Sequence, residues 1–278
     1  MTRTVETFPL VDLTLSRRLE RTEGHANAVI VDSRGRLEPS TGAIWKDIGG
    51  TYALFDGVGS PLTQTFGLGM FSEPDGAQFE AIEAFFAERG APALHEVSPL
   101  ADPSLLSLFA ERGYRPIELT SLLYQPLVDR ALPSIDPGAR VTVRRIDGQR
   151  EDEADGWAAV AAEGWGETPE VAAFVRDLGR VSARALDTHC FVAELDGRPI
   201  GTGSMHVHEG VALLAGASTI PQARRLGGQR ALLAARLRFA VDAGCDLAMM
   251  GAAPGSASQR NAERQGFRIA YTRIKWGR

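Results

Sequence analysis

The sequence has only two cysteines, Cys190 and Cys245, among its 278 residues. Two cysteines supply neither a disulfide framework nor a spaced set of metal ligands, so we expect both to be small buried residues in a reducing compartment. Long apolar runs are also missing. No stretch reaches the length of a membrane span, and the first residues hold no apolar core of the kind found in signal peptides. We therefore expect a cytoplasmic protein that makes no contact with membranes.

An excess of positive charge is absent as well. The chain carries 30 Lys and Arg against 35 Asp and Glu, a formal net charge of −5. General binding of nucleic acids requires a broad basic surface, so this composition argues against it. The length suits one large domain or two ordinary ones, each able to bury a core.

One basic stretch stands out from this acidic background. In the segment 218–229, an apolar strand ends in a short loop with two arginines and two glycines, and the loop opens a helix. Glycine lets the backbone approach an anion, and the first N–H groups of a helix and its dipole favour negative charge. The pattern predicts a diphosphate site. An ordinary strand-to-helix turn with solvated arginines fits the spacing equally well.

The sequence around this loop resembles the GNAT superfamily of acyl-CoA-dependent N-acetyltransferases, whose signature is Arg/Gln-x-x-Gly-x-Gly/Ala. On that pattern Arg224 is the first residue, Gly227 is the first glycine, and Gln229 replaces the second small residue. Further along, Gly266-Phe267 matches the Gly-Phe pair that follows the fourth helix of the family. The resemblance covers most of residues 139–278.

The resemblance implies an α/β fold with a mixed sheet flanked by helices, acetyl-CoA as co-substrate, and no metal. A strand N–H near Ser218 is then expected to face the thioester carbonyl, where negative charge develops during attack. The predicted cofactor contacts are the backbone of Ala217 and Thr219, the loop residues Arg224, Arg225, Leu226, Gly227, Gly228 and Gln229, and the amide of Asn261.

The catalytic acid and base are less clearly marked. Many family members place a carboxylate within the strand before the loop, but 211–219 contains none, so Glu209 is predicted as the base. The family's tyrosine acid, four residues before the Gly-Phe glycine, is Ala262 here. Other candidates for the base are His206, His208, Glu163 and Glu167, and for the acid Ser256, Ser258, Tyr271 or solvent. The two histidines share one strand face, as a metal pair would, but no third ligand is spaced with them.

An internal repeat indicates two copies of one fold. The segment 110–120 resembles 262–272, and each follows a helix, a short strand and a second helix. We predict a degenerate GNAT-like domain without a CoA loop at 1–130 and a GNAT acetyltransferase domain at 139–278, each a mostly antiparallel sheet flanked by helices. A proline-containing linker joins them. At the helix start of the first copy, Glu73 and Asp75 would repel a pyrophosphate, although Asp75 also suits an N-cap.

The sequence therefore predicts transfer of an acetyl group from acetyl-CoA to a primary amine of a small molecule or peptide. Trp157 and Trp165 fall in the family's variable substrate segment and form either an apolar wall for the acceptor or part of the core. A catalytically silent acyl-CoA binder or sensor remains the alternative, and turnover of acetyl-CoA with amines separates the two. A structural scaffold would bind no CoA at all. Oligomeric state is not indicated.

Overall fold

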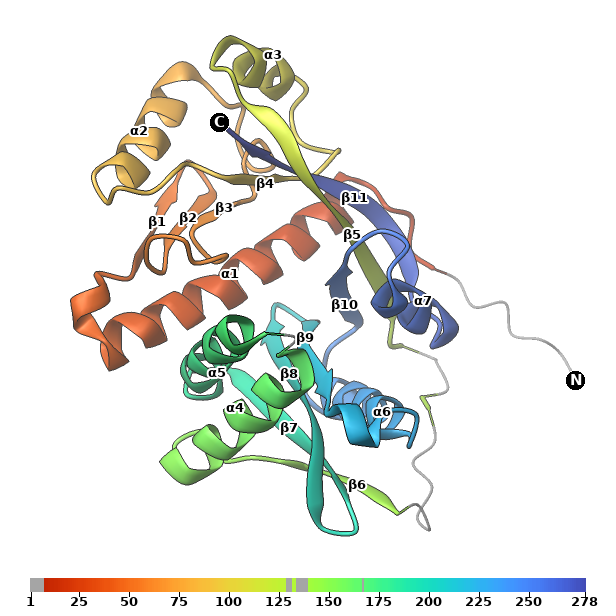
Figure 1. Ribbon diagram of the computed structural model, residues 1–278. Helices are drawn as coiled ribbons and strands as arrows, with labels where there is room; N and C mark the ends of the chain where they lie inside the picture. The colour runs from red at the N-terminus through yellow and green to blue at the C-terminus, as the bar shows by residue number, and fades with distance from the viewer. Residues whose placement is uncertain (1–7, 129–131, 134–139, 167) are drawn as a thin grey trace, which may run out of the picture. The chain divides into compact units, whose positions relative to one another are not determined.

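The computed structural model describes residues 8–128, 132–133, 140–166 and 168–278, and most of the expected linker lies outside these ranges. The chain divides into two compact units. Unit 1 combines Met1–Pro126 with Met249–Arg278, and unit 2 is Leu127–Ala248. The elements of both are labelled in Figure 1.

Unit 1 starts with its longest helix, α1 (Leu13–Leu37), which begins where the Asp12 carboxylate accepts a hydrogen bond from the Leu15 N–H at 2.8 Å. Such a cap satisfies one of the N–H groups that a helix start leaves unpaired. The other elements of unit 1 are β1 (Ile44–Ile48), β2 (Thr51–Phe55), β3 (Gln64–Phe66), α2 (Gly76–Ala87), β4 (His95–Val97), α3 (Ser104–Glu111), β5 (Arg115–Pro126), α7 (Ala257–Arg264) and β11 (Arg268–Gly277). Strand β10 (Leu247–Ala252) crosses the boundary between the units.

The sheet of unit 1 contains a strand from the far end of the chain. Its order is β1-β2-β3-β4-β11-β5, with β10 next to β5, so β11 is inserted between two strands of the N-terminal half. β11 runs antiparallel to both neighbours, whereas β3 and β4 are parallel. Removing β11 would therefore leave β4 and β5 without their shared partner.

The pairing of β5 with β11 has an internal twofold symmetry. Each strand begins with the arginine that follows a Gly-aromatic pair, and Arg115 pairs with Gly277 just as Arg268 pairs with Tyr124. The centre is the pair Thr120 and Arg273, which occupy the same place in the two strands. Each strand also has one register shift, after its second residue, where the third residue is left without a partner. Two copies of one sequence would produce such a register.

The segment before α2 differs in charge from the basic loop before α6. Leu68 and Met70 are buried at its start, and the Arg17 Nε donates to the Met70 carbonyl at 2.6 Å. Ser72, Glu73 and Asp75 are exposed. Asp75 is the N-cap of α2, because its carboxylate accepts from the Gln78 N–H at 2.7 Å. Carboxylates and a capped helix start thus stand where a diphosphate would need positive charge and free N–H groups.

Unit 2 is an antiparallel sheet with helices. Its elements are β6 (Val141–Arg145), α4 (Glu151–Trp165), α5 (Pro169–Ala183), β7 (Thr188–Leu195), β8 (Arg198–His208), β9 (Val211–Thr219) and α6 (Gly228–Asp242). The order β9-β8-β7-β6 follows the chain in reverse. Hairpin turns form at Asp196-Gly197 and Glu209-Gly210, with positive φ at all four residues as a type I′ turn requires.

Helices pack on the two faces of this sheet. One face carries an apolar cluster in which Trp157 of α4 packs with Cys190 and Val192 of β7. Phe191 points to the opposite face, because side chains alternate along a strand, and its ring contacts Phe239 of α6 at 5.7 Å. The two cysteines are free and buried, as expected from their small apolar character.

The compact units and the expected sequence domains differ in one segment. The boundary after Pro126 is close to the expected end of the first domain, but the segment from Met249 onward belongs to unit 1. The division into copies at 1–130 and 139–278 remains a prediction about the origin of the chain. Among the described residues, no helix is both long enough and apolar enough to cross a bilayer.

A buried cation holds β11 in unit 1. Arg273 is 1% exposed, and its guanidinium lies 2.9 Å from a Glu23 oxygen, 3.4 Å from Glu20 and 3.5 Å from Glu96. Tyr271 donates to the Glu20 carboxylate at 2.9 Å. Burial raises the pKa of Glu20 to about 7, and the charge of Arg273 opposes that rise only in part. Three carboxylates around one guanidinium thus tie α1 and β4 to β11.

Replacing Glu20 should change how stability depends on pH. Glu20 binds its proton more tightly in the folded protein than in the unfolded chain, so it contributes stability below about pH 4.5 that is lost as pH rises to about 7. Glu20→Gln should abolish this loss, which we expect to be on the order of 2–4 kcal/mol. Denaturant unfolding of both proteins from pH 4 to 8 measures the difference. Glu118→Gln, at an exposed carboxylate, is the control, and a difference independent of pH would refute the assignment.

Candidate functional site

The end of β9 is irregular where it approaches the basic loop. Ser204 pairs with Ala215 and Thr202 pairs with Ser218, so Gly216 and Ala217 both lie opposite Gly203. Gly216 has φ +58°, a conformation that L side chains rarely adopt. This β-bulge breaks the regular ladder, and Ala215 and Gly216 are exposed residues within unit 2. Apart from the glycine itself, nothing in the sequence indicates this bulge.

The side chain of Ser218 is used within the fold. It is buried, and its Oγ lies 2.7 Å from the Thr202 Oγ1. The Gln229 side chain points back to the strand, where its Nε2 donates to the Ser218 carbonyl at 2.6 Å and to the Thr219 Oγ1 at 2.8 Å. Gln229 therefore joins the first turn of α6 to the last residues of β9.

The basic loop has the backbone geometry of an anion nest. Arg225 has φ +70° and Gly227 has φ +90°. Arg224 follows a 3-10 turn and has an extended backbone. The N–H groups of Arg224 and Leu226 bond to carbonyls of the preceding turn, and among the described residues those of Arg225 and Gly227 have no such backbone bond. Backbone N–H groups left unbonded in such a turn are suited to bind an anion.

The helix that follows adds further donors. Gly227 is the N-cap of α6 and has no side chain to bond the first N–H groups, so these groups remain available to a ligand. Gly228 is buried against the sheet, where a Cβ would lie 3.3 Å from the Ile200 Cδ1. Arg224, Arg225 and Leu226 are exposed, as are Gln229 and Arg230. The loop therefore brings positive side chains, a helix dipole and unpaired N–H groups together.

Several other predicted residues lie in unit 1. Asn261 lies on α7, and its contact with CoA remains a prediction. Tyr271 is 7% exposed and bonded to Glu20, and both its burial and that carboxylate raise its pKa, so the structure gives no support for Tyr271 as the acid. Ser256 caps α7 by accepting from the Gln259 N–H at 3.2 Å.

Two of the candidate bases, Glu209 and His206, lie in the β8–β9 turn and on β8. Glu209 lies in the β8–β9 turn with 56% of its side chain exposed and an oxygen 4.0 Å from the His208 Nε2. At about 3.3 Å a residue, this turn is roughly 20 Å along β9 from Ser218. His206 is buried near the C-terminal end of β8. Among the described residues, no group of three His, Cys, Asp or Glu is placed to hold a metal ion.

The end of α4 lies much closer to the bulge. A Cβ on Gly164 would be 2.7 Å from the Ser218 Cβ, so this turn of the helix touches β9. Its neighbour Glu163 is exposed, whereas Glu167 lies outside the described residues. Trp157 is a core residue whose Nε1 donates to the Phe191 carbonyl at 2.9 Å, but Trp165 is 53% exposed. Trp157 is therefore part of the core, and a role for Trp165 in contacting the acceptor remains a prediction.

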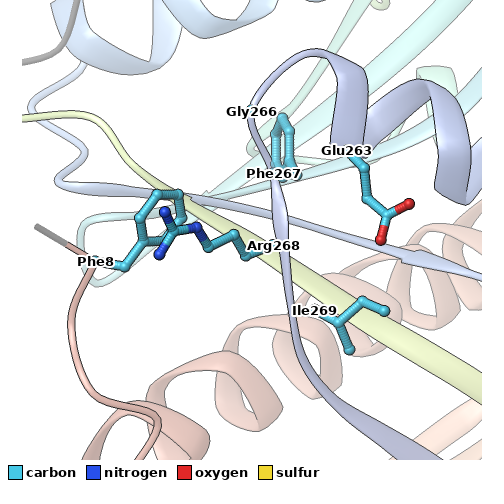
Figure 2. Close-up of a pocket in the computed structure, with 6 residues that line it drawn as sticks. All are labelled: Phe8, Glu263, Gly266, Phe267, Arg268 and Ile269. Carbon is cyan, nitrogen blue, oxygen red and sulfur yellow. The ribbon is translucent and has the colours of Figure 1, made fainter. Parts of the chain in front are cut away.

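Figure 2 shows a cavity of unit 1 with a volume of about 410 Å³. Its lining residues are Phe8, Glu263, Gly266, Phe267, Arg268 and Ile269. The Arg268 guanidinium covers the Phe8 ring at 3.8 Å, and Figure 2 shows the two side chains next to each other. None of the predicted cofactor residues lines this cavity.

Comparison with solved structures defines the class of fold. A GCN5-related N-acetyltransferase from Kribbella flavida has a TM-score of 0.62 at 20% identity, covering 90% of this chain and 95% of that one. A tandem GNAT protein from the clavulanic acid biosynthesis pathway has a TM-score of 0.53 at 15% identity, covering 73% and 68%. A Drosophila protein has a TM-score of 0.52 at 15% identity, covering 95% and 94%. The chain has a GNAT fold.

A sequence match adds to this likeness of fold. Residues 152–267 match the model of the acetyltransferase (GNAT) family, and this segment contains the β9 bulge and the basic loop. No curated protein matches the sequence. Residues 152–267 therefore form a GNAT acetyltransferase domain.

Reversing the charge at one position of the loop should weaken the binding of CoA. Arg224→Glu replaces a charge-assisted contact to the diphosphate with repulsion, and we expect a loss on the order of 1–3 kcal/mol in binding free energy. Calorimetry on the full chain at constant ionic strength measures the loss. Arg238→Glu is the matched control, because Arg238 is exposed further along the same helix. Equal CoA affinities for wild type and Arg224→Glu would show that Arg224 is not part of the CoA site.

Proposed function

We propose that this protein transfers an acetyl group from acetyl-CoA to a primary amine of a small molecule or peptide. The proposal rests on three features that follow one another along one short segment. They are an exposed bulge at Gly216, the end of β9 at Thr219, and an anion nest at Arg225–Gly227 directly before α6. A cofactor with a diphosphate at one end and a thioester at the other needs such a series.

The cofactor would lie along this segment. Its diphosphate would accept hydrogen bonds from the first N–H groups of α6 and from the loop, with the charges of Arg224 and Arg225 nearby. Its pantetheine arm would pair with the backbone of Ala217 and Thr219. Its thioester would then reach the bulge.

The reaction needs three things from the protein. The amine must lose its proton before its lone pair attacks the thioester carbon, the oxygen of the tetrahedral intermediate must be stabilised, and the CoA thiolate must leave. Backbone N–H groups at the bulge near Ser218 stabilise the oxygen of the tetrahedral intermediate. Solvent supplies the proton to the thiolate, since Ala262 replaces the family's tyrosine and Tyr271 is bonded inside unit 1.

Two carboxylates compete for the role of base. Glu209 is the nearest to β9 in sequence, but it lies in the turn at the far end of the strand. Glu163 lies in the turn of α4 that touches Ser218, so its carboxylate, directly or through one water, is better placed for an amine at the thioester. We therefore propose Glu163 for this role and keep Glu209 as the alternative.

The two carboxylates can be told apart by their pH profiles. Glu163→Gln should lower the rate more than about tenfold near neutral pH, where most of the amine is protonated, and recover at high pH, where free amine is abundant. Glu209→Gln should keep the wild-type profile. Release of free thiol from acetyl-CoA with a panel of primary amines measures both. The opposite pattern would assign the base to Glu209, and full activity in both variants would exclude the pair.

A catalytically silent acyl-CoA binder is the second candidate. It is favoured by one observation, the absence of a carboxylate from β9 together with alanine at the position of the family's tyrosine. Such a protein would bind acetyl-CoA and lose this binding in Arg224→Glu, yet release no thiol with any amine. Saturable binding without turnover over a wide range of amines and pH would establish it.

A further inference from the structure

Arg236 is a buried cation in the middle of unit 2. It lies on α6, it is 3% exposed, and among the described residues no carboxylate pairs with it. Its Nε donates to the Leu232 carbonyl of its own helix at 3.2 Å. Its Nη1 donates to the Ser204 carbonyl of β8 at 3.1 Å and to the Ala215 carbonyl of β9 at 3.2 Å.

Burial of an arginine without a carboxylate is unfavourable, so its place in the fold calls for a reason. Burial lowers the pKa of Arg236 to about 10, and the group still carries its charge at neutral pH. The sheet also makes room for it, since a Cβ on Gly203 would lie 2.9 Å from the Arg236 Cζ. Gly203 is the residue opposite the bulge.

The bulge is thus held from both faces of the sheet. On the face of α4, a Cβ on Gly216 would lie 2.9 Å from the Ser204 Oγ and 3.5 Å from the Trp157 ring. On the face of α6, the Arg236 guanidinium bonds the Ala215 carbonyl. That carbonyl and the N–H of Gly216 belong to one peptide group. A cation on the oxygen draws electron density through the amide and makes its N–H a stronger donor.

We propose that Arg236 is a positioning residue of the transfer reaction, which fixes the bulge and strengthens the N–H groups that face the acyl oxygen. This inference rests on the proposed function, because it assigns the purpose of the bulge to the thioester. Arg236 itself touches neither cofactor nor acceptor. Its contribution therefore appears in the chemical step and not in the capture of CoA, which depends on the loop at the other end of the segment.

The variant Arg236→Met separates these steps. Methionine keeps most of the length and removes the charge, so the buried position stays filled. We expect kcat to fall about tenfold or more, as for the loss of part of an oxyanion contact, while the acetyl-CoA dissociation constant changes less than about twofold. Arg236→Lys, which keeps the charge, should recover part of the rate. Arg238→Met on the exposed face of α6 is the control.

A second variant tests the same inference if Arg236→Met fails to fold. Gly203→Ala leaves the arginine in the chain but pushes its guanidinium away from the bulge, so kcat should fall in the same direction. Unchanged kcat in both variants would overturn the inference and leave the proposed function intact.

Backbone motion tests the inference without any assay of activity. In the free protein, 15N relaxation should show larger motion of the N–H groups of Gly216 and Ala217 in Arg236→Met than in wild type, with unchanged motion in the β6–β7 pairing. Equal motion at the bulge would refute the role of Arg236. A wild-type protein that releases no thiol with any amine would refute the proposed transfer, and the relaxation result would still test whether Arg236 holds the bulge.

Discussion

The ion network around Arg273 is the interaction on which unit 1 depends. An arginine at the centre of β11 is buried against carboxylates of α1 and β4, and removal of Arg273 would leave these carboxylates without their shared cation in the interior. Because β11 is the last strand of the chain and α1 the first helix, the network joins elements that are far apart in sequence. The N-terminal half therefore completes its sheet only with the C-terminal strand. This explains why unit 1 is discontinuous in sequence.

The pairing of β5 with β11 agrees with the internal repeat in the sequence. β5 and β11 follow equivalent helices and equivalent Gly-aromatic pairs, and they pair with a register that is symmetric about Thr120 and Arg273. Each strand carries one unpaired residue at the same place. The exposed residues Glu73 and Asp75 precede α2, whereas the exposed residues Arg224 and Arg225 precede α6. Duplication of one domain would produce this symmetric pairing, and the division into two copies remains a prediction.

Local features of the fold could be predicted from the sequence because local chemistry determines them. Asp-Gly and Glu-Gly supply the positive φ of two hairpins, the periodicity of α4 and α5 locates two helices, and the basic loop before α6 marks an anion site. The insertion of β11 between β4 and β5 could not be predicted. The sequence of β11 suits any half-buried strand, and only the register of the sheet reveals its partners. Arg236 was also missed, because a single arginine on a helix with other arginines carries no signal of burial. Sequence proximity favoured Glu209, but a strand separates it from the bulge.

The central claim is that one short segment, from the bulge of β9 to the first turn of α6, holds acetyl-CoA along its length. A crystal structure of the full chain with acetyl-CoA tests this most directly. The account predicts the diphosphate on the N–H groups of Arg225 and Gly227–Gln229, and the thioester oxygen within hydrogen-bond distance of a backbone N–H at Gly216–Thr219. A diphosphate bound elsewhere, or a thioester directed away from the bulge with the diphosphate in the loop, would contradict it.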